Sequence, residues 1–239
     1  MKKNYTILSL YYALMALGLF VCKHLLNTPY GSSNFSEKFL PFMILLSLLV
    51  LYYGLKNKDQ LVLSRSKSPS YLLSALIFIP VAGFGIYSII KGFSLNLAFF
   101  VLIIDTALIG IAEEGMFRGI VLGGLVRKIH PVLAILISAF LFSLLHILNI
   151  LGGLPFSEVT NQMLSTFIMG VFLAAMYLDT KNIIFPIIFH SLWDYIMLSE
   201  SLAEISFLPL LLIGINVGEI IVSLLIIIKL MKASKQFYI

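Results

Sequence analysis

Long apolar runs separated by short polar segments dominate the sequence. A helix needs about 20 predominantly apolar residues to cross the roughly 30 Å hydrocarbon core of a bilayer. By that measure we find eight candidate spans, of which the second and the sixth are short: residues 5–22, 39–55, 71–90, 98–118, 131–151, 163–178, 183–199 and 207–228. The pattern predicts an all-α fold, a polytopic membrane helix bundle with about eight transmembrane helices.

The polar segments between these runs are short. The longest cover residues 23–38, 56–70 and 152–162, and none is large enough for a soluble domain with its own core. No internal period of about 20 to 50 residues and no convincing inverted repeat is visible, which weighs against a secondary transporter. We therefore expect a single transmembrane domain over residues 1–239, with a motif-bearing core at residues 98–199.

Composition supports a membrane protein. The chain is 60% hydrophobic and 11% charged, with a mean hydropathy of +1.05, whereas charged residues make up about a quarter of soluble domains. The formal charge of +5 arises from short basic clusters between apolar runs, which read as topology signals, so we expect no nucleic-acid partner. A single cysteine, Cys22, excludes an intramolecular disulfide and a cysteine-based metal cluster.

Lysine and arginine positions predict the orientation of the bundle. If both termini are cytoplasmic, twelve of these residues lie in cytoplasmic segments, three lie in outer loops and one lies inside a span. Because basic residues accumulate on the cytoplasmic side, we expect cytoplasmic termini; the small, basic chain also suits a bacterial plasma membrane. The cytoplasmic set is Lys2, Lys3, Lys56, Lys58, Arg65, Lys67, Arg127, Lys128, Lys181, Lys229, Lys232 and Lys235, and the outer set is Lys23, Lys38 and Lys91.

Ionisable residues inside the apolar runs are the candidates for function. Each costs about 2.5 to 3.5 kcal/mol at the centre of a spanning helix on insertion scales, so such residues usually face a bundle interior and pair with one another. They are Asp105, Glu113, Glu114, Arg118, His146, His190, Asp194 and Glu219.

Two adjacent glutamates in the fourth run are predicted to differ in role. On a helix, Glu114 and Arg118 share a face at a spacing of four residues with the acid on the N-terminal side, so we expect an ion pair. Glu113 is rotated by about 100° around the same helix and points to a different neighbour. Glu113 is thus the carboxylate left available for chemistry, unless both glutamates only hold helices together.

Two histidines lie in other runs. His146 has Asn149 on roughly the same helix face, and a lone buried histidine is more often a hydrogen-bonded structural residue than a catalyst. His190 and Asp194 are four residues apart, where the carboxylate can orient the imidazole. This second pattern is the stronger signal, although an intrahelical structural pair is an alternative.

The remaining buried acids have weaker interpretations. Asp105 lies about two helical turns before Glu113 and is expected to support the site or to pack. Asn216 and Glu219 share a face of the last run and are assigned to helix packing.

A glutamate, two histidines and a second carboxylate form a set suited to hydrolysis. Glu113 and His146 can hold and activate a water molecule. His190 and Asp194 can stabilise the oxyanion formed when that water attacks an amide. A metal-assisted version is an alternative, since Glu113, His146 and His190 resemble the ligands of a hydrolytic zinc site. The HExxH spacing is absent, so no local motif indicates a divalent metal such as zinc.

Three clusters resemble the motifs of a known family. The segment Glu113–Arg118 resembles EExxxR, Phe142–His146 resembles FxxxH, and His190–Asp194 resembles HxxxN with aspartate in place of asparagine. In order and in placement they are similar to the CPBP (Abi) family of intramembrane proteases, which is related to type II CAAX prenyl endopeptidases and to bacteriocin-processing and immunity proteins. The resemblance covers residues 98–199.

This resemblance implies an all-helical intramembrane endopeptidase with a buried polar active site, acting on a peptide or a membrane protein. It assigns water activation to Glu113 and His146 and the oxyanion site to His190 and Asp194, with the ion pair of the first motif in support. Metal use has been argued both ways for this family. Aspartate at position 194 donates a hydrogen bond only when it is protonated, whereas asparagine donates at any pH.

Two other functions remain alternatives. A non-catalytic bacteriocin-immunity or regulatory membrane protein of the same fold would use the motif residues to hold helices together and would bind a partner membrane protein. A proton-coupled transporter would rest only on the buried ionisable residues.

The first and third motifs lie at different predicted depths in the membrane, so they can meet only if one helix departs from a straight, perpendicular span. At about 1.5 Å per residue, Glu113 lies about 21 Å from Arg127, whereas His190 lies only about 13 Å from Lys181. We therefore expect a tilted, broken or extended helix, and the four glycines between residues 115 and 124 favour an irregular end to the fourth run.

Overall fold

The computed structural model describes residues 2–61, 71–202 and 204–235, and the regular structure within these ranges is helical. The all-helical fold class is thereby confirmed. In chain order the elements are α1 (Lys2–Phe20), η1 (Val21–Leu25), α2 (Phe35–Lys56), α3 (Lys58–Leu61), α4 (Leu72–Lys91), α5 (Leu97–Glu114), η2 (Gly115–Leu122), α6 (Gly123–Leu125), α7 (Pro131–Leu145), η3 (His146–Ile150), α8 (Phe156–Thr180), α9 (Ile184–Leu198) and α10 (Leu208–Lys235).

Six helices of the described residues are long and apolar enough to cross a membrane. They are α1 with η1, α2, α4, α7 with η3, α8 and α10. The other two predicted spans are also helical, but α9 has only 15 residues and α5 carries three acidic residues. The chain is a multi-pass membrane helix bundle.

The second and sixth predicted spans are longer than expected. Helix α2 has 22 residues and α8 has 25. Polar residues that the hydropathy pattern assigned to loops lie in the first turns of both helices, at residues 36–38 in α2 and at residues 157, 158 and 160–162 in α8. Helical hydrogen bonding is local, so it extends past the apolar stretch into the polar flanks.

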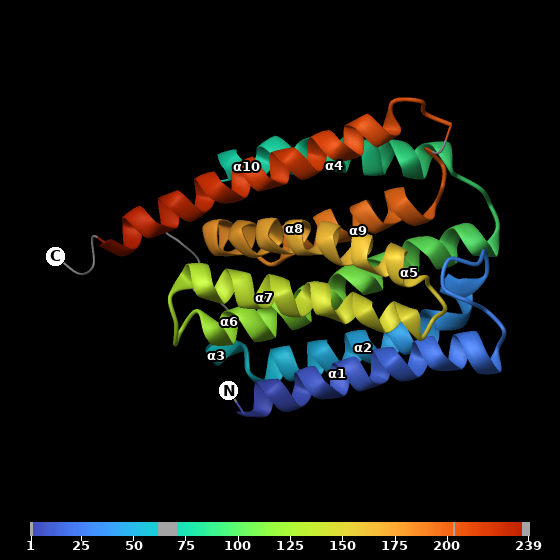
Figure 1. Cartoon of the computed structure of the whole chain (residues 1–239), viewed down its shortest axis with the longest axis horizontal. Helices are drawn as coiled ribbons and strands as arrows, with labels where there is room; N and C mark the ends of the chain where they lie inside the picture. The colour runs from blue at the N-terminus through green and yellow to red at the C-terminus, as the bar shows by residue number, and fades with distance from the viewer. Residues whose placement is uncertain (1, 62–70, 203, 236–239) are drawn as a thin grey trace.

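The helices lie roughly along the long axis of the molecule (Figure 1). Helices α1 and α2 form one side of the bundle, α4 and α10 form the opposite side, and α5, α7, α8 and α9 lie between them. Both termini lie at the same end (Figure 1). Of the basic residues used to predict orientation, Arg65 and Lys67 lie outside the described residues.

An irregular segment follows α5, as the glycines predicted. Residues Gly115–Leu122 form the π-helical η2, whose wider turns advance less per residue than an α-helix does. A Cβ on Gly115 would lie 2.5 Å from Val50 Cγ1, so glycine lets α2 pack closely at this point. The glutamates just before this segment lie beside His190 of α9, with Glu114 Oε1 2.7 Å from His190 Nδ1.

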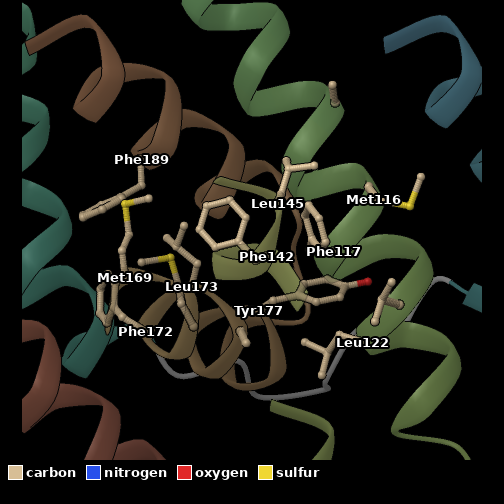
Figure 2. Close-up of a cluster of buried hydrophobic side chains, with 14 of the residues drawn as sticks. Met116, Phe117, Leu122, Phe142, Leu145, Met169, Phe172, Leu173, Tyr177 and Phe189 are labelled. Carbon is tan, nitrogen blue, oxygen red and sulfur yellow. The ribbon is translucent and has the colours of Figure 1, made fainter. Parts of the chain in front are cut away.

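Buried hydrophobic side chains fill the space between η2, α7, α8 and α9. Figure 2 shows Phe117 and Phe142 side by side within this cluster, with ring centroids 5.4 Å apart. Lipid tails are as apolar as these side chains, so close van der Waals packing rather than exclusion from water favours the cluster. Its labelled members are Met116, Phe117, Leu122, Phe142, Leu145, Met169, Phe172, Leu173, Tyr177 and Phe189.

Close packing of α5 against α9 depends on Gly110. A Cβ at this position would lie 2.7 Å from the carbonyl oxygen of Ile187 and would also collide with Ser191 Oγ. Because a backbone atom of α9 blocks the added carbon, the two helices would have to separate. Both carry residues of the three motifs, so their spacing sets the geometry of the candidate site.

We predict that Gly110→Ala destabilises the protein by about 1 to 3 kcal/mol, as overpacking does elsewhere. The matched control is Gly83→Ala in α4, because no atom lies within 4 Å of the added carbon there. Thermal unfolding in detergent should show a lower midpoint for Gly110→Ala than for Gly83→Ala. Equal midpoints would contradict the close α5–α9 contact.

Candidate active site

A cavity of about 1040 Å³ lies between the bundle helices. Its lining includes residues 30–37, residues 92, 94, 96 and 98, and residues 197–200, so it extends to the helix connections at the end of the bundle away from both termini (Figure 1). The structure brings the four predicted catalytic residues to this one cavity from three elements, α5, η3 and α9. They are Glu113, His146, His190 and Asp194.

The predicted ion pair between Glu114 and Arg118 is present and completely buried. Arg118 Nη1 donates to Glu114 Oε1 at 2.8 Å, and neither side chain is exposed. Arg118 Nη2 donates to the carbonyl oxygen of Gly170 at 3.3 Å, and the guanidinium lies 4.4 Å from the centre of the Phe142 ring. These contacts stabilise a charge that lipid does not solvate.

Gly170 and Phe142 support the site in ways that the motif spacing did not reveal. A Cβ on Gly170 would lie 3.1 Å from Phe142 Cδ1 and 3.2 Å from the α7 backbone, so glycine lets α8 approach closely. The Phe142 ring also meets His146 and His190 edge to face, with centroids 5.2 and 5.5 Å away. The phenylalanine of the second motif therefore packs between the buried guanidinium and both imidazoles.

His190 is surrounded by three carboxylates. Its Nδ1 lies 2.7 Å from Glu114 Oε1 and donates to it, because an ionised carboxylate only accepts. Its Nε2 lies 3.4 Å from Asp194 Oδ2 and 3.9 Å from Glu113 Oε2. Glu114 thus contacts two motifs at once, an arrangement that the spacing of the first motif did not predict.

Glu113 lies apart from the ion pair, as the helix geometry predicted. Only 5% of its surface is exposed, and it lines the cavity. Its Oε2 has no hydrogen-bond partner among the described residues. This oxygen is itself buried, so the described residues leave part of the hydrogen-bonding capacity of a cavity-lining carboxylate unsatisfied.

His146 lies at the junction between α7 and the 3₁₀ segment η3. Its Nδ1 is 3.2 Å from the carbonyl oxygen of Phe142. A carbonyl only accepts, so this nitrogen carries the proton and the neutral ring presents Nε2 as an acceptor.

A polar chain that the motifs did not indicate lines the same cavity. Asn149 Nδ2 donates to Gln162 Oε1 at 2.8 Å, and Gln162 Nε2 donates to the Tyr30 hydroxyl at 3.3 Å. Burial raises the pKa of Tyr30 to about 12, so its hydroxyl stays protonated at neutral pH. Gln162 and Tyr30 come from segments that the hydropathy pattern assigned to loops, which hid their part in the cavity.

Two further buried acids differ in their surroundings. Asp105 lines the cavity, and its Oδ1 has no hydrogen-bond partner among the described residues. Glu219 is fully buried in α10, away from the cavity lining, and neither of its oxygens has such a partner there.

The three candidate metal ligands do not form a ready coordination group. Within the described ranges, no three His, Cys, Asp or Glu side chains are arranged to hold a metal ion. The geometry of Glu113, His146 and His190 therefore supplies no metal-dependent step, and metal use stays a prediction.

We predict that Arg118→Met destabilises the protein by about 3 to 5 kcal/mol, because it leaves the Glu114 carboxylate buried without its counter-charge. Adding Glu114→Gln should recover part of the loss, since the neutral amide oxygen still accepts from His190. Thermal unfolding of the single and double variants in detergent measures the difference. No recovery in the double variant would show that the charge pair is not the cause.

Comparison with known protein families finds a match that covers part of the chain. Residues 94–196 match the family model described as type II CAAX prenyl endopeptidase Rce1-like, and this segment holds all three motifs. No curated protein matches the chain. The match over residues 94–196 is consistent with the resemblance of the three motifs to the CPBP proteases.

Proposed function

We propose that this protein is an intramembrane endopeptidase that hydrolyses a peptide or a membrane-associated substrate with a water activated by Glu113 and His146. The family match supports an intramembrane CAAX-type protease at the level of the family. The unpartnered Glu113 oxygen, set in a cavity wall beside His190, carries the proposal for this chain.

In the proposed reaction, a water molecule binds between Glu113 and His146. Glu113 accepts one proton while the water oxygen attacks the carbonyl carbon of the substrate amide. The resulting tetrahedral intermediate carries its negative charge on the former carbonyl oxygen. Glu113 then returns the proton to the amide nitrogen as the C–N bond breaks, leaving a new carboxyl group and a new amine.

His190 and Asp194 are proposed to stabilise the oxyanion. Because Nδ1 of His190 donates to Glu114, His190 donates to the oxyanion from Nε2 in its doubly protonated form, and a protonated Asp194 adds a second donor. Glu114 is proposed to orient the ring, and Arg118 balances the charge of Glu114.

The same geometry suggests how the protein lies in the membrane. The basic residues support a plasma-membrane protein with both termini on the cytoplasmic side. The termini share one end of the bundle and the cavity extends toward the other (Figure 1). In this orientation, the substrate reaches the site from the outer face of the membrane.

A metal-assisted version would use a divalent ion such as zinc bound by Glu113, His146 and His190. We expect cleavage by the purified protein to persist after exhaustive chelation. Loss of cleavage on chelation, with recovery on adding zinc, would contradict the metal-free mechanism.

We predict that Glu113→Gln and His146→Ala each reduce peptide cleavage by at least about 100-fold, as loss of a general base or its partner does. The substrates are a panel of small secreted peptides, and cleavage products are measured by mass spectrometry. Glu219→Gln is the matched control, because it changes a buried carboxyl outside the cavity lining.

Normal cleavage by either catalytic variant would contradict the mechanism. Full biological activity of Glu113→Gln without any peptide cleavage would instead favour a non-catalytic immunity or regulatory protein that binds a membrane partner.

A further inference from the structure

The cavity lining contains several acidic residues but, among the described residues, no lysine or arginine. Five acids and two histidines of the described residues line it. The acids are Glu37, Asp105, Glu113, Asp194 and Glu200. An acidic cleft with low-dielectric walls concentrates cations and repels anions.

Four of these acids have either a basic neighbour or exposure to solvent, which stabilises their negative charge. Glu37 accepts from Lys38 at 2.9 Å, and Glu200 is exposed to solvent. Glu113 and Asp194 lie within 3.9 and 3.4 Å of His190 Nε2.

Of the described lining, Asp105 is the one acid for which these contacts provide no partner. It is 3% exposed, and its Oδ1 has no hydrogen-bond partner among the described residues although it lines the cavity. Ser36 is its side-chain hydrogen-bond partner. The charged neighbour that interacts with it electrostatically is Asp194, which is also an acid. A buried carboxylate without a counter-charge is unfavourable at membrane depth. A cationic group entering the cavity would compensate it.

The position of Asp105 relative to Glu113 indicates where that cation would lie. Both are on α5, eight residues apart, which corresponds to about 12 Å along the helix. Asp105 is the nearer to the start of α5, at the end of the bundle toward which the cavity extends. An extended peptide advances about 3.3 Å per residue, so 12 Å corresponds to about four peptide residues.

We propose that Asp105 is a specificity residue that pairs with a lysine or arginine of the peptide substrate, about four residues from the scissile bond on the side of the cavity mouth. This inference rests on the proposed peptidase function and adds a substrate class, peptides with a basic residue at that position. A charge-assisted hydrogen bond from an ammonium or guanidinium group to a carboxylate is about twice as strong as a neutral hydrogen bond. Acidic peptides are rejected by the same charges.

Binding without cleavage tests the proposal directly. Two fluorescent peptides that differ only by lysine or glutamine at the proposed position are titrated against Glu113→Gln protein in nanodiscs. The lysine peptide should bind at least about tenfold more tightly. Adding Asp105→Asn should remove that preference and leave the glutamine peptide within about twofold. Adding Glu219→Gln instead, a buried carboxyl outside the cavity lining, should preserve the preference.

A scan of the lysine along the peptide, with the protein unchanged at position 105, gives a test that does not depend on the Asp105→Asn variant folding. One preferred position about four residues from the cleaved bond supports the proposal. Equal binding of the two peptides, or a preference that survives Asp105→Asn, overturns it.

Cleavage of the same peptides by the protein with Glu113 intact separates the two proposals. Cleavage without any charge preference contradicts only the role of Asp105. Charge-selective binding without cleavage of either peptide contradicts the peptidase function and leaves the binding site.

Discussion

The buried charge pair between Glu114 and Arg118 is the interaction on which the geometry of the site depends. Neither side chain is exposed, and separating two charges in a medium without water is strongly unfavourable. The pair links α5 and η2 to the Gly170 carbonyl of α8, and Glu114 extends it to His190 of α9. The Glu114–Arg118 pair thus connects three parts of the bundle, and its contact with His190 holds that imidazole in place.

Glycines allow the helices that carry this charge pair and its partners to pack closely. Gly110 lets α9 approach α5, Gly115 lets α2 approach the start of η2, and Gly170 lets α8 approach α7. Helix association in lipid depends on such close approach, since there is little hydrophobic gain from burying one apolar helix against another. The π-helical η2 follows directly after the two glutamates of the first motif, which contact His190 of the third. Packing and electrostatics therefore act together here.

The buried acids of α5 differ in whether they line the cavity. Glu114 pairs with Arg118 and His190 through Oε1, and its Oε2 has no hydrogen-bond partner among the described residues. Glu113 and Asp105 likewise each have one oxygen without such a partner, and both residues line the cavity. Unsatisfied buried polar atoms are rare in folded proteins because they are costly. At the wall of the cavity such atoms are more consistent with a bound water molecule or ligand than with packing, and the proposed catalytic residue and the proposed specificity residue both lie on α5.

Much of the fold and part of the site follow from the sequence alone. Apolar runs determine where helices form, because backbone groups in lipid must be satisfied within each segment, and the spacing of four residues determines the Glu114–Arg118 pair. Both are local properties. Contacts between helices are not local: the bond from Glu114 to His190 joins residues 76 apart, and the chain from Asn149 through Gln162 to Tyr30 spans three segments. Only the tertiary structure decided them, because side-chain periodicity shows which face of a helix is buried but not which helix lies opposite.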